Sequence, residues 1–251
     1  MAPPILVTGG TGTLGQHVVA RLREAGCYIR VLSRHSHSGR DGIQFLTGNL
    51  ATGEGLQPAV DGVATIVHCA SSPKGDAGAT RNLVRAAASS GAPHLVYISI
   101  VGVDGLAFGY YRSKLESERV VAGCGLPWTT LRATQFYDLI LKGARPLARL
   151  PVIPVPAGFV VQPVDAGEVA ARLAGLALGD PAGQVPDMGG PRVRSFADLI
   201  RAYLGASGRR RLVVPVRLPA TRKIRAGALL PAPSAAAGHR TWEEFLAGRL
   251  K

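Results

Sequence analysis

Two runs of residues in this sequence have the types and spacing that chemistry needs. The first is rich in glycine, Thr8-Gly9-Gly10-Thr11-Gly12-Thr13-Leu14-Gly15, and the second is Tyr110-Tyr111-Arg112-Ser113-Lys114. A glycine-rich turn can hold backbone N–H groups against a phosphate, because no side chain keeps the two apart. A tyrosine with an ammonium group nearby can give its phenolic proton to a carbonyl oxygen. The rest of the sequence indicates the elements that position both runs.

The glycine-rich run lies between an apolar segment, residues 5–7, and a helix-patterned segment, residues 16–25. In this order Gly9 takes the positive φ of a tight turn, Gly12 lets the backbone approach a phosphate, and Gly15 lets the helix pack on the strand. The N–H groups near Thr13 and Leu14 then face the anion at the positive end of the helix dipole. A strand, a glycine turn and a helix in this order predict a site for the pyrophosphate of a dinucleotide.

The loop after the second predicted strand, residues 28–32, indicates which dinucleotide binds. An NAD site usually places an acidic residue there for the ribose 2′-hydroxyl, but this chain has Ser33-Arg34. Arg34 can pair with a 2′-phosphate, Ser33 can donate a hydrogen bond to it, and Arg40 is a second candidate. We therefore expect NADP(H) as the cofactor, with NAD(H) less favoured.

Two further loops are candidates for the walls of this site. Asn49 and Leu50 follow the third predicted strand, where an adenine could rest on the leucine and bond the amide. Cys69-Ala70-Ser71 ends the fourth predicted strand, where small residues would let the nicotinamide ribose approach. Cys69 is expected to be a wall of the site and not a reactive thiol, because no activating histidine or helix terminus is identified.

The second run is predicted to lie on a helix after the fifth strand. Tyr110 and Lys114 are four residues apart and share a helical face, while Tyr111 is three residues from Lys114. Beside a nicotinamide, one tyrosine could act as the acid, and the lysine could lower its pKa and hold the ribose hydroxyls. Tyr110 is the first choice for the acid, and Tyr111 stays open.

Apolar runs alternate with helix-patterned segments through the first half of the chain. Strands are predicted at residues 5–7, 28–32, 44–46, 63–69, 94–99 and 128–131, and helices at residues 16–25, 77–90 and 108–122. Strands separated by helices need crossover connections, which give a parallel sheet covered on both faces. The predicted fold class is α/β, a Rossmann-type doubly wound parallel sheet with a small C-terminal substrate lobe.

The pattern loosens after residue 135. We expect residues 1–135 to form the dinucleotide-binding core, with a late strand and helix at residues 164–189 returning to it, and residues 136–163 and 190–251 to form the substrate lobe. Asp165 and Glu168 stand before an apolar run. They predict a helix start at which Asp165 caps the first turn and Glu168 reaches back.

The net charge of +13 is unevenly distributed. Residues 190–251 hold 13 of the 29 Lys and Arg residues but only three of the 16 acidic ones. Such a region could face an anionic substrate, a nucleic acid or an acidic membrane surface, or it could be a solvated face. No aromatic interleaving or RNA-binding signature accompanies the charge, so no nucleic-acid partner is expected.

Other compositional features exclude several classes of protein. No segment approaches the ~20 apolar residues of a membrane span, and Met1-Ala2-Pro3-Pro4 lacks the basic start of a signal peptide. We therefore expect a cytoplasmic protein without a membrane partner. The three cysteines are far apart and the six histidines lack ligand spacing, so neither a disulfide framework nor a metal site is predicted.

Over nearly its whole length the sequence resembles the atypical or extended branch of the short-chain dehydrogenase/reductases, which includes the NmrA-like proteins. Thr8-Gly9-x-x-Gly12-x-x-Gly15 is similar to that branch's cofactor fingerprint, and Tyr110-x-x-x-Lys114 to its active-site pair. The segment Leu131-Arg132-Ala133-Thr134-Gln135-Phe136 resembles one that borders the nicotinamide, which implies cofactor contacts for Gln135 and Phe136. The C-terminal Gly190-Pro191 and Thr241-Trp242-Glu243-Glu244-Phe245 look like the substrate lobe of bacterial NAD(P)-binding reductases.

The chain departs from this family's pattern at one catalytic position. Members with the full catalytic set carry Ser or Thr where this chain has Ile100, after Ser99. The loss of one oxyanion donor commonly costs ~10²-fold or more in rate. A quinone or flavin acceptor, for which solvent supplies the proton, would tolerate that loss.

Three functions are compatible with these residues. The first is an NADPH-dependent oxidoreductase that reduces a small organic acceptor such as a ketone, a quinone or an imine, in which Gln135, Phe136 and Tyr137 line the acceptor pocket and Arg222 or Arg225 reaches in. The second is a non-catalytic, NmrA-like sensor of NADP(H). The third is an isomerase or epimerase that uses a bound cofactor without net redox change. The chain is expected to be a monomer or a homodimer.

Overall fold

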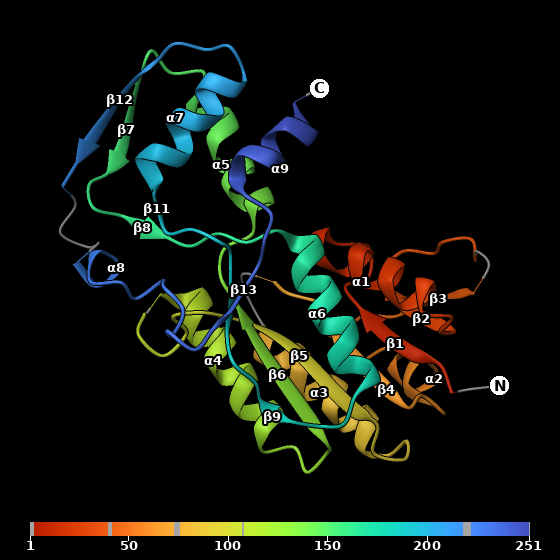
Figure 1. The fold of residues 1–251 in the computed structure, drawn as a ribbon. Helices are drawn as coiled ribbons and strands as arrows, with labels where there is room; N and C mark the ends of the chain where they lie inside the picture. The colour runs from red at the N-terminus through yellow and green to blue at the C-terminus, as the bar shows by residue number, and fades with distance from the viewer. Residues whose placement is uncertain (1–2, 40–41, 73–75, 107, 218–221, 251) are drawn as a thin grey trace. The chain divides into compact units, whose positions relative to one another are not determined.

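Short apolar runs in the first half of the chain form strands that alternate with helices (Figure 1). The computed structural model describes residues 3–39, 42–72, 76–106, 108–217 and 222–250. Up to residue 133 its elements are β1 (Ile5–Thr8), α1 (Thr13–Glu24), β2 (Ile29–Ser33), β3 (Ile43–Thr47), α2 (Leu56–Val60), β4 (Thr65–His68), α3 (Asp76–Ala88), β5 (His94–Ile100), α4 (Gly109–Ala122) and β6 (Trp128–Ala133). The predicted strands and helices of this part are confirmed, with ends that differ by up to three residues.

The second half of the chain has shorter strands between its helices. Its elements are α5 (Tyr137–Leu147), β7 (Val152–Pro156), β8 (Val160–Val161), α6 (Ala166–Leu178), β9 (Gly183–Gln184), β10 (Met188–Gly189), β11 (Arg194–Ser195), α7 (Phe196–Ala206), β12 (Leu212–Val216), α8 (Arg222–Arg225), β13 (Ala236–Ala237) and α9 (Trp242–Arg249). None of the helices in the described ranges is both long and apolar enough for a membrane crossing.

Two compact units divide the chain. The first unit comprises Met1–Ser99, Ala107–Leu131 and Val169–Val185, and the second comprises Ile100–Leu106, Arg132–Glu168 and Pro186–Lys251. The predicted division of labour between a cofactor core and a substrate lobe stays a prediction.

A parallel sheet forms the centre of the first unit. β1 pairs in parallel with β2 on one side and with β4 on the other, β2 continues to β3, and β4 continues to β5 and β6. The strand order therefore reverses between β1 and β4, and loops at the carboxyl ends of these strands diverge there to leave room for a ligand. This confirms the predicted Rossmann-type, doubly wound parallel sheet.

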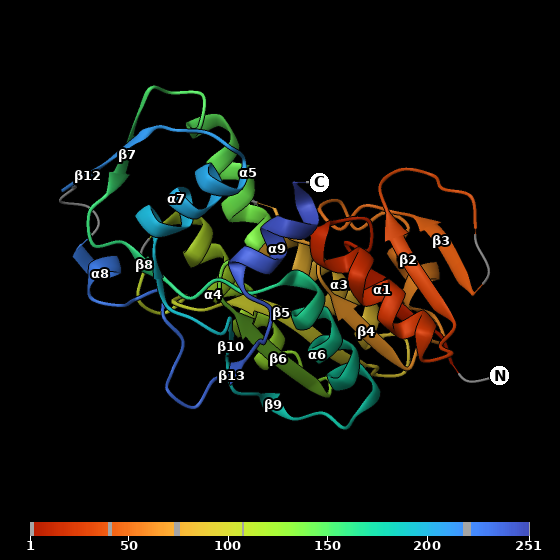
Figure 2. The ribbon, with the colours of Figure 1, turned by 45° about the horizontal axis from the view of Figure 1, so that its top comes forward.

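Helices cover both faces of this sheet. Figures 1 and 2 show α1 and the part of α6 that belongs to the first unit on one face, and α3 and α4 on the other. The sheet and α2, α3 and α4 enclose a core of buried apolar side chains that includes Leu6, Ile66, Leu83, Leu95 and Val121. Burial on both faces explains why the central strands read as continuous apolar runs.

The second unit has an aromatic core of its own. The ring of Tyr137 on α5 lies 5.5 Å from that of Trp242 and 5.3 Å from that of Phe245, both on α9. The Thr241 side chain accepts from Glu244 N and the Glu244 side chain accepts from Thr241 N, so a capping box starts α9.

The start of α6 differs in part from its prediction. Asp165 Oδ1 accepts hydrogen bonds from Gly167 N at 2.8 Å and Glu168 N at 3.3 Å, which confirms Asp165 as the cap. Glu168 does not reach back: its Oε1 accepts from His239 N at 2.7 Å and Arg240 N at 3.2 Å. A backbone segment 71 residues away thus takes the place of the local partner.

Candidate active site

The glycine-rich run forms a tight turn between β1 and α1. Gly9 has a φ of +68°, and Gly12 N donates to Gly9 O at 2.9 Å. Gly12 is the N-cap of α1 and makes no side-chain capping hydrogen bond. Thr11, Gly12 and Thr13 are exposed. The first turn of α1 therefore presents its N–H groups at the surface, with no side chain of the N-cap satisfying them.

The space around this turn fits a bound pyrophosphate. A Cβ on Gly9 would lie 2.6 Å from Ala70 N, and one on Gly15 would lie 2.1 Å from Gly9 O. The space around Gly12 is open. Among the described atoms, a Cβ built on Gly12 would meet only Gly9 O, at 3.2 Å. Backbone contact on the inside and open N–H groups on the outside are what a dinucleotide phosphate needs.

The predicted 2′-phosphate contacts lie at the end of β2. Arg34 is exposed, and none of the ion pairs among the described residues involves it. Ser33 is buried, and its Oγ accepts from His35 N at 3.2 Å and lies 3.1 Å from His37 Nε2. The His37 ring also lies 4.9 Å from the ring of Phe45. His37 is therefore part of this corner. Arg40 lies outside the described residues.

Asn49 and Leu50 lie in the loop that follows β3. Asn49 Oδ1 accepts from Ala51 N at 3.0 Å, so the amide carbonyl closes its own turn. Leu50 O accepts from Asn82 Nδ2 at 2.9 Å. These bonds hold the loop beside α3, and they leave the predicted adenine contact to the Asn49 NH₂ group and the Leu50 side chain.

Cys69, Ala70 and Ser71 follow β4 directly. The Gly9 turn approaches the Ala70 backbone closely, and Ala70 N donates to Thr8 Oγ1 at 3.4 Å. Burial raises the pKa of the Cys69 thiol to about 12, although the nearby Lys114 charge acts the other way. The thiol is therefore protonated at neutral pH, as the prediction of an unreactive wall residue requires.

Lys114 lies on the inner face of α4 and is almost fully buried, with a side-chain exposure of 2%. Its Nζ lies 3.3 Å from Asp76 Oδ2 and donates to Tyr97 Oη at 3.2 Å and to Ile98 O at 3.4 Å. Three partners match the three hydrogens of an ammonium group. Asp76 is also buried, so the two opposite charges are desolvated as a pair.

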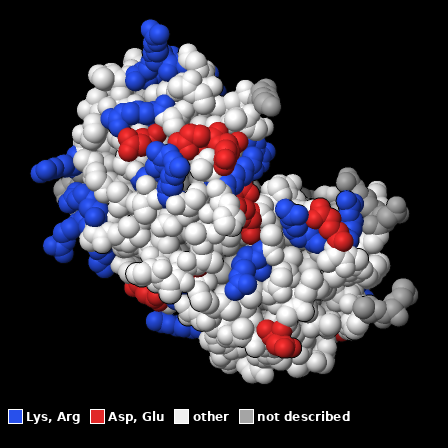
Figure 3. Space-filling model, in the orientation of Figure 1, with Lys and Arg blue, Asp and Glu red and all other residues white. Residues whose placement is uncertain are grey.

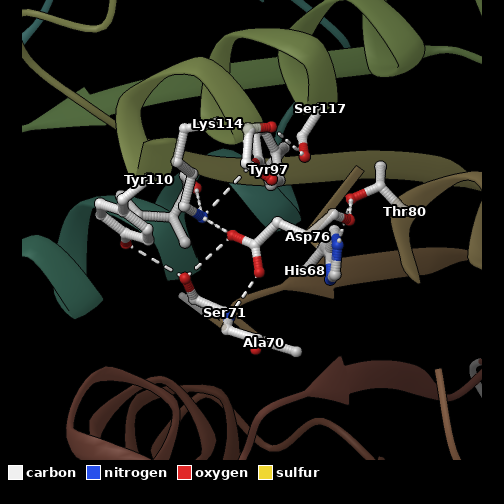
Figure 4. A network of polar contacts seen from close by, with 12 residues as sticks. His68, Ala70, Ser71, Asp76, Thr80, Tyr97, Tyr110, Lys114 and Ser117 are labelled. Carbon is white, nitrogen blue, oxygen red and sulfur yellow. Dashed lines mark hydrogen bonds and ion pairs between the residues drawn. The ribbon is translucent and has the colours of Figure 1, made fainter. Parts of the chain in front are cut away.

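Asp76 connects Lys114 to Tyr110 through Ser71 (Figure 4). Ser71 Oγ donates to Asp76 Oδ2 at 3.0 Å and lies 3.1 Å from Tyr110 Oη. Since the only hydroxyl hydrogen of Ser71 goes to the carboxylate, Tyr110 Oη must be the donor to Ser71. Ser72 N also donates to Asp76 Oδ1. Tyr110, Ser71, Asp76 and Lys114 thus form one directed chain of polar contacts.

A buried histidine lies beside Asp76 (Figure 4). His68 Nδ1 lies 2.7 Å from Thr8 Oγ1, and its Nε2 lies 3.1 Å from Thr80 Oγ1. Burial, and secondarily the Lys114 charge, lower the pKa of His68 to about 3. Burial also raises the pKa of the neighbouring Tyr97 hydroxyl. Both groups are therefore neutral at physiological pH, and Lys114 and Asp76 carry the charge of this cluster.

The two tyrosines of the second run have different surroundings. The Tyr110 hydroxyl faces Ser71, whereas the Tyr111 ring lies 6.4 Å from the ring of the half-exposed Phe108. This geometry favours Tyr110 as the acid. Ser99 Oγ is buried without a hydrogen-bond partner among the described residues, and Ile100 offers no hydroxyl at all.

The remaining predicted residues belong to the second unit. Gln135 O accepts from Val164 N at 2.9 Å, and the buried Gln135 Oε1 has no partner within the described ranges. Phe136 is the N-cap of α5. Tyr137 is a core residue, since it is 2% exposed and its hydroxyl donates to Arg240 O at 2.8 Å. Arg222 and Arg225 are exposed on α8.

Sequence reasoning missed Asp76, Tyr97 and His68, which belong to the polar cluster around Lys114. Asp76 is 38 residues before Lys114, on a different helix, and no local pattern connects the two. An acidic residue at the start of a helix ordinarily indicates an interaction with the helix dipole. Asp76 differs from such a residue because it is buried beside the Lys114 ammonium group.

Comparison with known proteins identifies the family of this chain. A family model described as NAD(P)H-binding matches residues 9–147, which is more than half of the chain. An NAD(P)H azoreductase of Xenophilus azovorans is 27% identical over 260 residues, a match that covers 98% of this chain and 90% of the relative. A sterol-4-alpha-carboxylate 3-dehydrogenase, decarboxylating, of Mus musculus is 43% identical over 67 residues, but this match covers only 18% of that protein.

Solved structures share the fold over nearly the whole chain. The NADPH-dependent quinone oxidoreductase of Escherichia coli, complexed with NADPH, has a TM-score of 0.85 at 20% identity, covering 98% of this chain and 100% of that one. The triphenylmethane reductase of Citrobacter sp., complexed with NADP(H), has a TM-score of 0.70 at 22% identity, covering 98% and 88%. At these identities the similarity establishes the fold.

Proposed function

The chain belongs to the NAD(P)H-binding family, and on that premise we propose that it is an NADPH-dependent reductase of a small organic acceptor such as a ketone, a quinone or an imine. The observation that carries this proposal is the contact chain from Tyr110 through Ser71 and Asp76 to Lys114. Ser71 in this contact chain follows Ala70, whose backbone the glycine-rich turn approaches at Gly9. A site that only bound the cofactor would not need such an arrangement.

A bound NADPH would supply the hydride, and Tyr110 supplies the proton. Its hydroxyl turns from Ser71 toward the acceptor and donates the proton as a general acid. The tyrosinate then regains a proton from solvent, because neither Tyr110 nor Ser71 is buried. Ser71 positions the Tyr110 hydroxyl, and the buried Asp76–Lys114 pair holds Ser71 in place. The roles of Gln135 and Phe136 as walls beside the nicotinamide, and of Gly12, Thr13, Leu14 and Gly15 at the pyrophosphate, are part of the same proposal.

The lack of a hydroxyl at Ile100 favours some acceptors over others. A ketone gains its alkoxide charge on one oxygen, which a hydroxyl donor at this position would stabilise. A quinone or an azo compound spreads that charge over a conjugated system. The names of the azoreductase and of the quinone oxidoreductase that this chain is similar to support a conjugated acceptor.

The test is NADPH and NADH oxidation by the purified chain with a panel of quinones, azo dyes, ketones and imines. We expect acceptor-dependent oxidation with a preference for NADPH. Binding of NADP⁺ in calorimetry without oxidation across the panel would favour the alternative of a redox sensor. Product formed without net cofactor consumption would favour the isomerase or epimerase. Absence of NADP⁺ and NAD⁺ binding would refute all three.

The cofactor preference is tested separately. Arg34→Ala should weaken NADP⁺ binding by about 10- to 100-fold and leave NAD⁺ binding unchanged, because a charge-assisted contact to the 2′-phosphate contributes about 1.5–3 kcal/mol. The control is Arg23→Ala, which removes an exposed arginine from the last turn of α1. An equal loss for both nucleotides would contradict the assignment of Arg34.

We further propose that the protein acts in the cytoplasm as a monomer or a homodimer. Size-exclusion chromatography with light scattering decides the oligomeric state.

A further inference from the structure

The small sheet of the second unit has one entirely apolar exposed face. β7 and β12 pair in parallel with Val152 opposite Leu212 and Pro156 opposite Val216. Ile153 and Val155 are buried, so this side of β7 faces the interior. Alternation along the strands places the other side chains on the opposite face. That face, here called the β7–β12 face, consists of Val152, Pro154, Pro156, Leu212, Val214 and Val216.

Four of the six residues of the β7–β12 face are exposed, and the other two, Pro156 and Val214, are half-buried. Leu212 is 63% exposed, Val152 46% and Val216 40%. Leu150, just before β7, is 42% exposed. Single exposed apolar residues are ordinary, but a contiguous set on one sheet face is typical of a docking surface.

Prolines disfavour growth of this sheet by strand addition. Leu212 N donates to Pro151 O at 3.4 Å and Ala157 N donates to Val216 O at 2.8 Å, which identifies the N–H groups that point between the strands. By alternation, the nitrogens of Pro154, Pro156 and Pro215 then point outward from the two edges. Proline has no N–H, so each edge keeps only one outward donor within its strand, Val152 N on β7 and Val213 N on β12. A partner therefore binds the face more readily than an edge.

Arginines flank both ends of the β7–β12 face. Arg149 precedes β7, Arg209, Arg210 and Arg211 precede β12, and Arg217 follows it. Arg209 Nη1 donates to Ala148 O at 3.5 Å, so the two leading loops lie together. None of these five side chains forms an ion pair within the described part of the chain. Figure 3 shows Lys and Arg side chains over the loop that leads into β12 and beside the end of β12.

We propose that the β7–β12 face and its arginines bind the surface of an anionic lipid bilayer. Apolar side chains enter the headgroup boundary while the arginines contact lipid phosphates, and neither interaction needs an aligned strand or a matching hydrogen-bond pattern. A second copy of the chain fits less well, because antiparallel association of two such faces would bring Arg209, Arg210 and Arg211 of one copy against Arg217 of the other.

Membrane binding gives a role to four of the 13 basic residues of the C-terminal region, Arg209, Arg210, Arg211 and Arg217. It also revises the expectation that the chain has no membrane partner. That expectation considered segments long enough to span a bilayer, whereas surface binding needs only a small apolar face and nearby cations.

The experiment is co-sedimentation of the full chain with vesicles of phosphatidylcholine alone or with about one third phosphatidylglycerol, at low and high salt. We expect binding to the anionic vesicles that falls with salt, because the arginine contribution is electrostatic. The triple variant Arg209→Ala, Arg210→Ala, Arg211→Ala should bind about 100-fold more weakly, at roughly fivefold per arginine. Leu212→Gln should also weaken binding and should leave the salt dependence unchanged.

The matched control removes three exposed arginines of the first unit, Arg23→Ala, Arg85→Ala and Arg119→Ala, and so has the same net charge as the triple variant. It should keep most of the binding. Equal losses in both triple variants, or no binding to anionic vesicles at low salt, would overturn the proposal. So would a dimer in solution that Leu212→Gln dissociates. The thermal unfolding midpoint of each variant checks that it is folded.

Discussion

At the scale of single residues, the polar cluster of the first unit depends on where one carboxylate lies. Asp76 accepts from Ser71 and pairs with Lys114, and both charged side chains are buried. Removing one partner of a buried pair leaves an unpaired charge, which commonly costs about 3–5 kcal/mol. Asp76 is therefore a positioning residue for Ser71 and Lys114 in the proposed reaction.

The first prediction concerns the choice between the two tyrosines. Tyr110→Phe should lower the turnover of a ketone by ~10²-fold or more, because a general acid contributes about that much. Tyr111→Phe is the control and should change turnover about twofold at most, since its ring lies beside Phe108. Steady-state rates of NADPH oxidation provide the measurement. Reversed effects would identify Tyr111 as the acid.

The second prediction concerns Asp76→Asn. This change keeps the shape of the side chain but removes the charge that faces Lys114. It should lower the unfolding free energy by about 3 kcal/mol, and it should alter the pH profile of kcat as well as its magnitude. Glu116→Gln removes an exposed carboxylate of α4 and is the control. A lower stability with an unchanged pH profile would make the role of Asp76 purely structural.

At the scale of elements, the turn between β1 and α1 combines two separate requirements. Gly9 has a positive φ, and a Cβ on it would also lie 2.6 Å from Ala70 N. Gly26, after α1, has a φ of +78° but no atom within 4 Å of a Cβ. The two glycines therefore separate the cost of backbone conformation from the cost of close approach.

The third prediction uses this pair. Gly26→Ala should lower the unfolding free energy by about 1 kcal/mol, which is the cost of the left-handed conformation alone. Gly9→Ala should cost roughly 3 kcal/mol or more and should abolish the thermal shift caused by NADP⁺, because β4 and the turn must separate. Thermal unfolding with and without NADP⁺ measures both effects. Similar costs for the two variants would show that Ala70 moves away easily.

At the scale of the whole molecule, buried histidines relate the stability of the fold to pH. Burial lowers the pKa of His68 to about 3 and also lowers the pKa of His94. Between pH 6.5 and about 3 the unfolded chain binds a proton at His68 that the folded chain does not. The unfolding free energy is therefore independent of His68 above the pKa of the unfolded state, and it decreases as the pH falls below that value.

The fourth prediction follows from that sign. The unfolding free energy should fall by up to about 1.4 kcal/mol per pH unit for His68 as pH decreases from about 6 to about 4. His68→Asn should reduce this slope by about 1.4 kcal/mol per pH unit, which corresponds to one proton. Substitution of the exposed His239 by Asn should not reduce it. Urea unfolding at several pH values measures the slope. Equal slopes for both variants would contradict the buried, neutral state of His68.

Several features of the protein were determined by the sequence alone. The alternation of apolar runs and helix patterns predicted the doubly wound sheet, because hydrophobic periodicity depends on local geometry. The glycine spacing predicted the turn, and Asp165 predicted the start of α6, because a turn and a cap each involve residues a few positions apart. The helices α5, α7, α8 and α9 were missed, since they lie in a part of the chain where that pattern loosens. The five-residue α2 was missed because it is too short to show a helical period.

Only the tertiary structure decided the features that join distant segments. Asp76 and Lys114 come from different helices, Ser71 from the end of a strand, and Glu168 finds its partners at His239 and Arg240. The β7–β12 face likewise needs two strands some 60 residues apart in register. Tertiary packing decides which polar groups are buried together and lose their contact with water. Neighbouring positions in the sequence do not decide this, so no local pattern predicts it.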